Sequence, residues 1–288
     1  MTAACPVLFG VAGWSYPDWL GIVYPRGTRP KLSVLAPYLD LMEINSTFYR
    51  PPEARLAAAW LREVSARPGF RFSAKLHQDI THGGRLEPDM IRAFGEGLRP
   101  LSEAGALFHL LAQFRYDFRD GPASRDRLRR LAEAFGDMAS LTLELRHNSW
   151  QSPGALAFLG VLPVAVANLD YPLARDSFNL SACCIGADRY LRLHGRNAAA
   201  WFDRAAGRDE TYNYNYSARE LDEIARRAET LRPGARSLTV VANNHFQARE
   251  VTNILQLKAL MTGQKVPVPP GLLACYPELN AIAAPAGS

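Results

Sequence analysis

The stretch Val7-Leu-Phe-Gly-Val-Ala12 is the first of eight short, nearly continuous apolar runs. Runs that are apolar at successive positions are typical of strands buried on both faces, as in parallel sheets. Between Leu8 and Leu238 the mean spacing of the runs is about 33 residues, which suits a repeating unit of strand, loop, helix and loop. The other seven runs span residues 39–44, 70–76, 106–113, 141–145, 164–169, 190–193 and 238–242.

Amphipathic helical patterns occupy three of the gaps, at residues 53–66, 125–135 and 218–231, and a fourth follows the last run at residues 247–261. The gap between the sixth and seventh runs lacks such a pattern, which predicts an irregular connection there. The predicted fold class is therefore α/β: one TIM (β/α)8 barrel with eight parallel strands over residues 1–263. Residues 264–288 are rich in Pro and Ala and predict a C-terminal tail that is surface-packed or partly ordered.

Composition sets limits on the class of protein. The 288 residues are 48% hydrophobic and 21% charged, which excludes disorder and collagen-like chains. No apolar run approaches the roughly 20 residues of a membrane span, and residues 1–11 lack the pattern of a signal peptide. The four cysteines form neither a zinc pattern nor a disulfide framework, so a cytoplasmic location is expected. The net charge of +5 comes almost entirely from arginine, with only four lysines in the chain.

Polar side chains follow all eight runs. Because the active site of a TIM barrel lies at the C-terminal ends of its strands, these side chains are expected to converge. We predict that one cavity holds Glu43, Lys75, Glu144, Arg146, Arg192, His194 and Asn243. Eight-stranded barrels are narrow, so Glu144 and Arg192 should lie less than about 15 Å apart.

The same residues also fit a purely structural role. Charged groups inside a barrel must be paired, or their burial costs several kcal/mol. Glu144 is placed to neutralise Arg192, and Glu43 to neutralise Lys75. A buried ion-pair network is therefore an alternative for each of these residues.

Several motifs in order resemble the domain-of-unknown-function 72, or YecE-like, family. They include Gly-Val-Ala-Gly-Trp-Ser-Tyr at 10–16, Glu-Ile-Asn-Ser-Thr-Phe-Tyr-Arg at 43–50, Glu-Leu-Arg-His-Asn-Ser-Trp at 144–150 and Arg-Leu-His-Gly-Arg at 192–196. The resemblance covers about residues 8–260. It implies a TIM barrel but no assigned reaction. One departure is Gln113, which is followed by Phe114-Arg115 where the family usually has Leu-Pro or Phe-Pro.

The first functional hypothesis is an enzyme acting on a phosphate-bearing or nucleic-acid-like substrate, and fold analogy with endonuclease IV-like barrels indicates a hydrolase. Guanidinium and ammonium groups would hold phosphates, and aromatic rings would stack on bases or sugars. The predicted catalytic residues are Glu43, Lys75, Glu144 and His194. The predicted substrate-binding residues are Trp14, Tyr16, Asn45, Tyr49, His82, Gln113, Arg146, His147, Asp170, Arg192, Arg196, Tyr212, Tyr214, Asn243 and Asn244.

Two other functions fit the same residues. Glu, Lys and His at an aromatic barrel mouth suit a sugar or sugar-acid isomerase or lyase, in which Lys75 would form a Schiff base. A binding protein without turnover is the third. Whether a divalent metal binds is left open, and no nucleotide-cofactor motif is present. The expected partners are an anionic small molecule or nucleic acid, with no membrane, and the sequence does not predict an oligomeric state. Residues 212–216 predict either a lid over the mouth or an extended edge segment.

Overall fold

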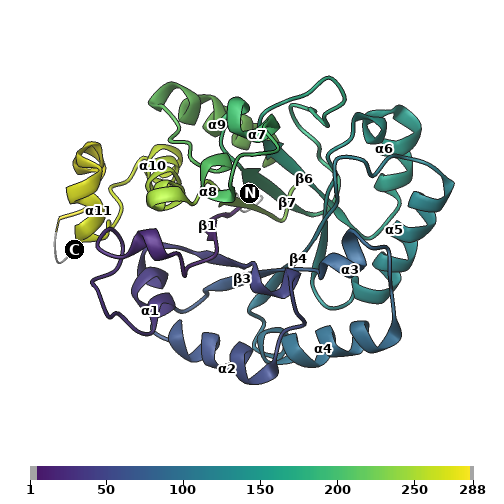
Figure 1. Cartoon of the computed structure of the whole chain (residues 1–288), viewed down its shortest axis with the longest axis horizontal. Helices are drawn as coiled ribbons and strands as arrows, with labels where there is room; N and C mark the ends of the chain where they lie inside the picture. Colours follow the sequence, from purple (N-terminus) through teal and green to yellow (C-terminus); the bar gives the residue numbers. More distant parts are fainter. Residues whose placement is uncertain (1–4, 286–288) are drawn as a thin grey trace.

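The computed structural model describes residues 5–285, so residues 1–4 of the predicted barrel domain and 286–288 of the predicted tail lie outside it. Within that range eight parallel strands close into a barrel in chain order, with β8 paired to β1 (Figure 1). The predicted TIM barrel is confirmed. The strands are β1 (Val7–Ala12), β2 (Leu41–Ile44), β3 (Arg71–Lys75), β4 (Leu107–Gln113), β5 (Ser140–Glu144), β6 (Ala165–Asp170), β7 (Asp188–Leu193) and β8 (Ser237–Ala242).

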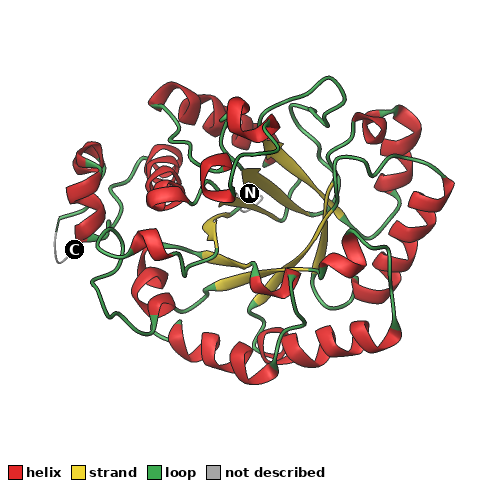
Figure 2. Cartoon of the chain, viewed as in Figure 1, coloured by secondary structure: helices red, strands yellow, loops and turns green. Residues whose placement is uncertain are grey.

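Helices surround the strands, as Figure 2 shows. The described helices are α1 (Lys31–Leu35), α2 (Ala54–Glu63), α3 (Gln78–Thr81), α4 (Pro88–Glu103), α5 (Pro122–Phe135), α6 (Pro153–Gly160), α7 (Ala198–Phe202), α8 (Arg208–Thr211), α9 (Ala218–Leu231), α10 (Arg249–Thr262) and α11 (Pro270–Cys275). The prediction for α9 has the observed bounds, and Ser217 forms a capping box with Glu220. Helices α4 and α6 were not predicted, because their internal Gly and Pro residues weaken the sequence pattern.

The barrel has two separate apolar cores. The larger one lies between the outer faces of the strands and the helices. The smaller one lies inside the barrel and consists of Ala12, Leu41, Ala167, Leu169, Tyr171, Tyr190 and Val241. Side chains alternate between the two cores along each strand. Buried polar residues share the inner core: His109 contacts Thr142 Oγ1 and Thr239 Oγ1, each at 3.0 Å.

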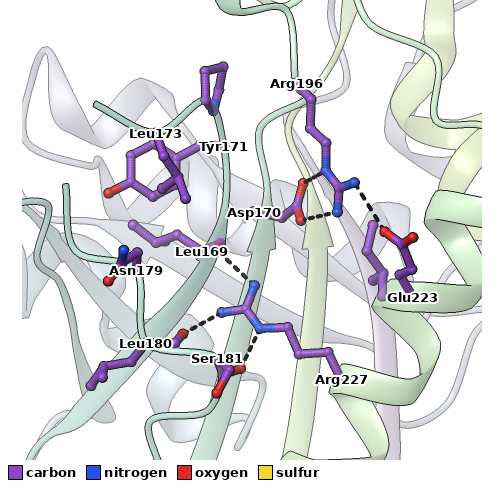
Figure 3. Close-up of a pocket in the computed structure, with 12 residues that line it drawn as sticks. Leu169, Asp170, Tyr171, Leu173, Asn179, Leu180, Ser181, Arg196, Glu223 and Arg227 are labelled. Carbon is purple, nitrogen blue, oxygen red and sulfur yellow. Dashed lines mark hydrogen bonds and ion pairs between the residues drawn. The ribbon is translucent and has the colours of Figure 1, made fainter. Parts of the chain in front are cut away.

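The connection from β6 to β7 contains no helix in the structure, as the sequence predicts. Arg227 on α9 holds it in place (Figure 3). Its guanidinium donates to the carbonyl oxygens of Leu169, Leu180 and Ser181 at 2.6–3.1 Å. A single planar group with five donors thus replaces the hydrogen bonds that a helix would supply.

The C-terminal tail packs on the barrel up to residue 285. Leu272 of α11 and Leu279 are fully buried, and Val266 pairs with Ala283 in an isolated bridge. Figure 1 shows α11 beside α10, away from the barrel axis. Of the described helices, none is long and apolar enough to cross a membrane.

Two glycines of α4 provide a test of helix packing. A Cβ on Gly97 would collide with the Pro52 carbonyl oxygen, whereas a Cβ on Gly95 would meet only Met138 Cε at 3.5 Å. We expect Gly97→Ala to lower the free energy of unfolding by about 1–3 kcal/mol. Gly95→Ala should raise it by up to about 1 kcal/mol through helix propensity. Urea denaturation measures both, and equal effects of the two substitutions would contradict the packing.

Candidate functional site

The candidate site begins with the inward-facing residues at the ends of the strands. Strands β2, β3, β5 and β7 carry Glu43, Lys75, Glu144 and Arg192 respectively. Strand register places Gln113 of β4 beside Glu144. Parallel strands end at the same rim, so alternation alone brings these side chains together.

Arg192 is the centre of the group, and its side chain is fully buried. Its Nη2 and Nε donate to Glu43 Oε1 at 2.6 Å and Oε2 at 3.1 Å, and its Nη1 donates to Glu144 Oε2 at 2.7 Å. Gln113 Oε1 accepts a further bond from Nη1 at 3.2 Å. The structure thus brings Glu144 and Arg192 into direct contact, well within the predicted limit.

Glu144 joins this centre to three other predicted residues. Arg146 donates to Glu144 Oε1 from Nη2 at 2.6 Å and from Nε at 2.9 Å. His194 Nε2 lies 3.5 Å from the same oxygen, and Asn243 Nδ2 lies 3.1 Å from His194 Nδ1. A neutral His194 ring protonated on Nε2 satisfies both neighbours.

Lys75 is the least tightly held charge of the group. The predicted pairing with Glu43 is present, but Nζ lies 3.9 Å from Oε1, beyond hydrogen-bond distance. Burial and the nearby Arg192 lower the pKa of Lys75 to about 7, although Glu43 and Glu144 act against them. The amine of Lys75 therefore titrates near neutral pH.

Glu43, Glu144 and His194 each keep a single protonation state at neutral pH. Burial is the largest single influence and raises the pKa of Glu43 and Glu144, but Arg192, the other nearby cations and the hydrogen bonds together outweigh it and lower both pKa values. Burial lowers the pKa of His194 to about 4, so this ring is neutral. Glu43, Glu144 and His194 are also sealed from solvent, whereas 13% of the Lys75 and 16% of the Arg146 side chain is exposed.

Arg146 faces a cavity of about 560 Å³ at the mouth. The cavity is lined by Tyr116, Arg146, Tyr171, Ala174, Asp176, Ser177, Trp201, Phe202, Arg204, Thr211 and Tyr212. Trp201 lies against the Arg146 guanidinium, with 5.5 Å from the ring centroid to Cζ. Sequence reasoning did not include Tyr116, Trp201 or Arg204 in the site. All three lie on loops or short helices, where no strand pattern points to the mouth.

The segment from α7 to Tyr212 covers the network. Trp201 and Tyr212 each contact His194, with ring centroids 5.7 and 6.2 Å away. The segment is attached to the neighbouring rim after β8 and β1, because Asp209 lies 3.2 Å from His245 and Arg208 donates to the Tyr16 hydroxyl at 3.3 Å. Of the aromatic stretch 212–216, only Tyr212 has the position predicted for a lid. Tyr214 and Tyr216 turn away and bond to Glu220 and Asp170.

Asp170, Arg196 and Asn244 do not join the central group. Leu169 belongs to the inner core, so alternation turns Asp170 to the outer face of β6. There Arg196 donates to both Asp170 oxygens at 2.7 and 2.9 Å (Figure 3). Asn244 donates to the carbonyl oxygen of Tyr214 and to Asn253 Oδ1, both at 2.8 Å. The expectation that polar residues after every strand converge is therefore wrong for these positions.

The remaining predicted residues line the rim. Asn45 donates to the Ala12 carbonyl oxygen at 2.8 Å, and Trp14 packs edge-on against Trp60. Tyr16 stacks on His245 at 4.5 Å. His147 accepts a hydrogen bond from the Ser149 backbone.

Tyr49 and His82 form an exposed part of the rim on the β2–β3 side. Both contact the ring of Phe48, at 5.2 and 5.1 Å between centroids. The Lys75 Nζ lies over the same Phe48 ring at 5.8 Å. Tyr49, His82 and the amine therefore share one aromatic neighbour, and the two rim residues are open to solvent.

The network leaves little carboxylate capacity for a metal. Three of the four carboxylate oxygens of Glu43 and Glu144 accept hydrogen bonds from arginines at 2.7 Å or less, and the fourth accepts from Arg192 and Tyr190. Over residues 5–285 no three His, Cys, Asp or Glu side chains are grouped as metal ligands. Whether a divalent metal binds therefore stays open, as it does from the sequence.

Comparisons with known proteins agree with the fold. The model of the family described as "Protein of unknown function DUF72" matches residues 8–273. The chain is similar to the UPF0759 protein YunF of Bacillus subtilis, with 26% identity over 88% of this chain and 94% of that protein. Among solved structures, a DUF72 family protein of Enterococcus faecalis has a TM-score of 0.79, with 26% identity over 89% of this chain and 95% of that one. One from Thermotoga maritima has a TM-score of 0.77, with 27% identity over 89% and 99%.

Replacement of Arg192 tests the central ion pairs. We expect Arg192→Met to lower the free energy of unfolding by about 3–5 kcal/mol, because two buried carboxylates lose their partner. Adding Glu43→Gln and Glu144→Gln to Arg192→Met should restore part of the loss. Arg219→Gln, at a side chain that is 90% exposed, is the control and should change stability by less than about 0.5 kcal/mol. A loss no larger than that of the control would contradict the account.

The buried histidines predict how stability depends on pH. Burial lowers the pKa of His109 and His194 to about 4, below the ordinary value near 6.5 that they regain on unfolding. As pH falls below 6.5, the unfolded chain binds protons that the folded chain refuses, so stability falls until pH about 4. Each histidine contributes up to about 3 kcal/mol. Denaturant titrations between pH 6.5 and 5 should show this fall, less steep in His109→Gln, and a constant stability would contradict it.

Proposed function

The chain belongs to the DUF72 family of proteins of unknown function, and from this premise we propose that it is an enzyme acting on a phosphate-bearing or nucleic-acid-like substrate at the barrel mouth. The observation that carries the proposal is the position of Arg146. Its guanidinium lines the 560 Å³ cavity and is paired with the buried carboxylate of Glu144.

Arg146 is suited to bind an anion because part of it is uncommitted. Its Nε and Nη2 donate to Glu144, but no described residue accepts from Nη1. Arg204, which is exposed and has no described ion-pair partner, lines the same cavity. Two guanidinium groups on one cavity provide the planar donors that phosphate oxygens accept.

The aromatic residues that line the cavity suit a substrate that contains a ring. Trp201, Tyr212 and Tyr116 line the cavity, and the Tyr116 side chain is 65% exposed. Aromatic faces bind bases and sugars by stacking without requiring a particular sequence. A cavity that has two arginines beside such rings suits a nucleotide or a phosphorylated sugar.

Lys75 and Arg146 are the two residues of the network that combine a charge with exposure to solvent. In this proposal Lys75 takes or gives the proton in the reaction, and Glu43, Glu144 and Arg192 position it. The second candidate, a sugar or sugar-acid isomerase or lyase, is supported by the same loosely paired amine. Four free cysteines support a reducing cytoplasm as the location.

Binding of phosphate compounds to Arg146→Gln tests the proposal. Titration calorimetry with inorganic phosphate, a sugar phosphate and a short single-stranded oligonucleotide should show at least about a tenfold weaker affinity, because a charge-assisted bond of about 1.5–3 kcal/mol is lost. Arg219→Gln is the surface control and should bind as the unaltered protein does. Affinity unchanged in Arg146→Gln would contradict the proposal, and binding without turnover of any ligand would favour a non-catalytic binding protein.

A further inference from the structure

The charges of the central network do not balance. Two carboxylates, Glu43 and Glu144, face three basic groups, Arg192, Arg146 and Lys75. Arginine keeps its proton in proteins, so lysine is the only one of the three that can release the surplus charge. Lys75 is therefore the residue that would balance the charges of the network by losing its proton.

The hydrogen bonds lead to the same residue. Glu43 Oε1 accepts from Arg192 at 2.6 Å, and Oε2 accepts from Arg192 and from the Tyr190 hydroxyl at 2.9 Å. Lys75 Nζ, at 3.9 Å from Oε1, makes no side-chain hydrogen bond to any described residue. Only solvent is then left to accept hydrogen bonds from a charged ammonium in this largely buried position, which favours the neutral amine.

The backbone and the surroundings hold Lys75 in a position to react. It is the last residue of β3, and the Thr47 hydroxyl donates to its carbonyl oxygen at 2.7 Å. The Phe48 ring lies beneath the amine, and 13% of the side chain reaches solvent at the mouth. Lys75 is therefore held in place with part of its side chain open to solvent, although it is not among the residues that line the 560 Å³ cavity.

We propose that Lys75 is a nucleophile that forms an imine with an aldehyde or ketone group of the substrate. The proposal deepens the proposed function, because it adds a carbonyl group to the phosphate-bearing substrate. It makes the same site suited to isomerase or lyase chemistry on a sugar phosphate.

The step balances without an added oxidant or reductant. The lone pair of the neutral amine forms a bond to the carbonyl carbon, the C=O π electrons move to oxygen, and one N–H proton passes from nitrogen to that oxygen. The carbinolamine loses its hydroxyl group together with the second N–H proton as water, which leaves a C=N bond. Once solvent protonates the imine nitrogen, the imine accepts the electron pair that remains when water takes a proton from the neighbouring carbon.

The charged groups around Lys75 support a neutral amine at neutral pH. Burial, Arg192 and Arg146 lower its pKa, Glu43 and Glu144 raise it, and the resulting pKa is about 7. An ordinary lysine has a pKa near 10.4, so about 0.1% of it is neutral at pH 7.5, and a much larger fraction of Lys75 is neutral at the same pH.

The other three lysines of the chain serve as internal controls. Lys258 is paired with Asp40 at 2.9 and 3.0 Å, and Lys31 donates to Ser15 Oγ at 3.3 Å. Lys265 is exposed and donates to the Ala281 carbonyl oxygen. None of these three contacts the central network in the described structure.

The test is reductive trapping of the full chain with glycolaldehyde and, separately, with glycolaldehyde phosphate, in the presence of cyanoborohydride at pH 7.5. Peptide mapping by mass spectrometry then locates the secondary amine. We expect Lys75 to be modified at least about tenfold faster than Lys31, Lys258 and Lys265, since its neutral fraction is far larger. The rate at Lys75 should level off above pH about 8, while the other three rates keep rising.

Two variants complete the test. Lys75→Met removes the amine without adding a permanent charge and should lose the fast adduct while retaining the thermal unfolding midpoint, whereas Lys258→Arg should keep the adduct. Lys75 modified no faster than the exposed Lys265 would overturn the proposal, even if phosphate compounds bind. Fast modification of Lys75 by both aldehydes alike, with no preference for the phosphate ester and no binding of phosphate, would uphold the nucleophile and contradict the phosphate part of the proposed function.

Discussion

The burial of one guanidinium, that of Arg192, is the constraint on which the site depends. A fully buried arginine is tolerated only if carboxylates neutralise it and accept its hydrogen bonds. Glu43 and Glu144 do so from β2 and β5, so one side chain of β7 is linked to two other strands across the barrel. The ion pairs stabilise the barrel, and they also decide which charges at the mouth are left for a ligand.

Two consequences for chemistry follow from that constraint. Glu144 uses its second oxygen to hold Arg146, which leaves one nitrogen of that guanidinium directed at no protein acceptor. Both oxygens of Glu43 already accept from Arg192, and Lys75 Nζ stays 3.9 Å from Oε1 without a hydrogen bond. The structural role expected as an alternative and the functional role are thus not exclusive: the buried pairs position the two residues that reach solvent.

The sequence predicts the barrel well and the site in part. Continuous apolar runs mark buried parallel strands, and the rule that strands end at one rim is enough to group Glu43, Lys75, Glu144 and Arg192. The same rule fails for Asp170, because a residue one position further along a strand faces the opposite side. It fails for Arg196 because this residue lies beyond the end of β7, after Gly195 with its positive φ, and pairs with Asp170. Trp201 and Arg204 escape prediction because they reach the cavity from the segment after β7, whose path depends on contacts distant in sequence.

The most direct measurement of the central claim is the protonation of Lys75 itself. With only four lysines in the chain, protein labelled with ¹³C at lysine Cε gives four resolvable NMR signals to follow with pH. The account predicts that one signal titrates near pH 7, disappears in Lys75→Arg and is unaffected by Lys258→Arg. Four signals that all titrate above pH 9 would contradict it, because Lys75 would then hold its proton as firmly as a surface lysine.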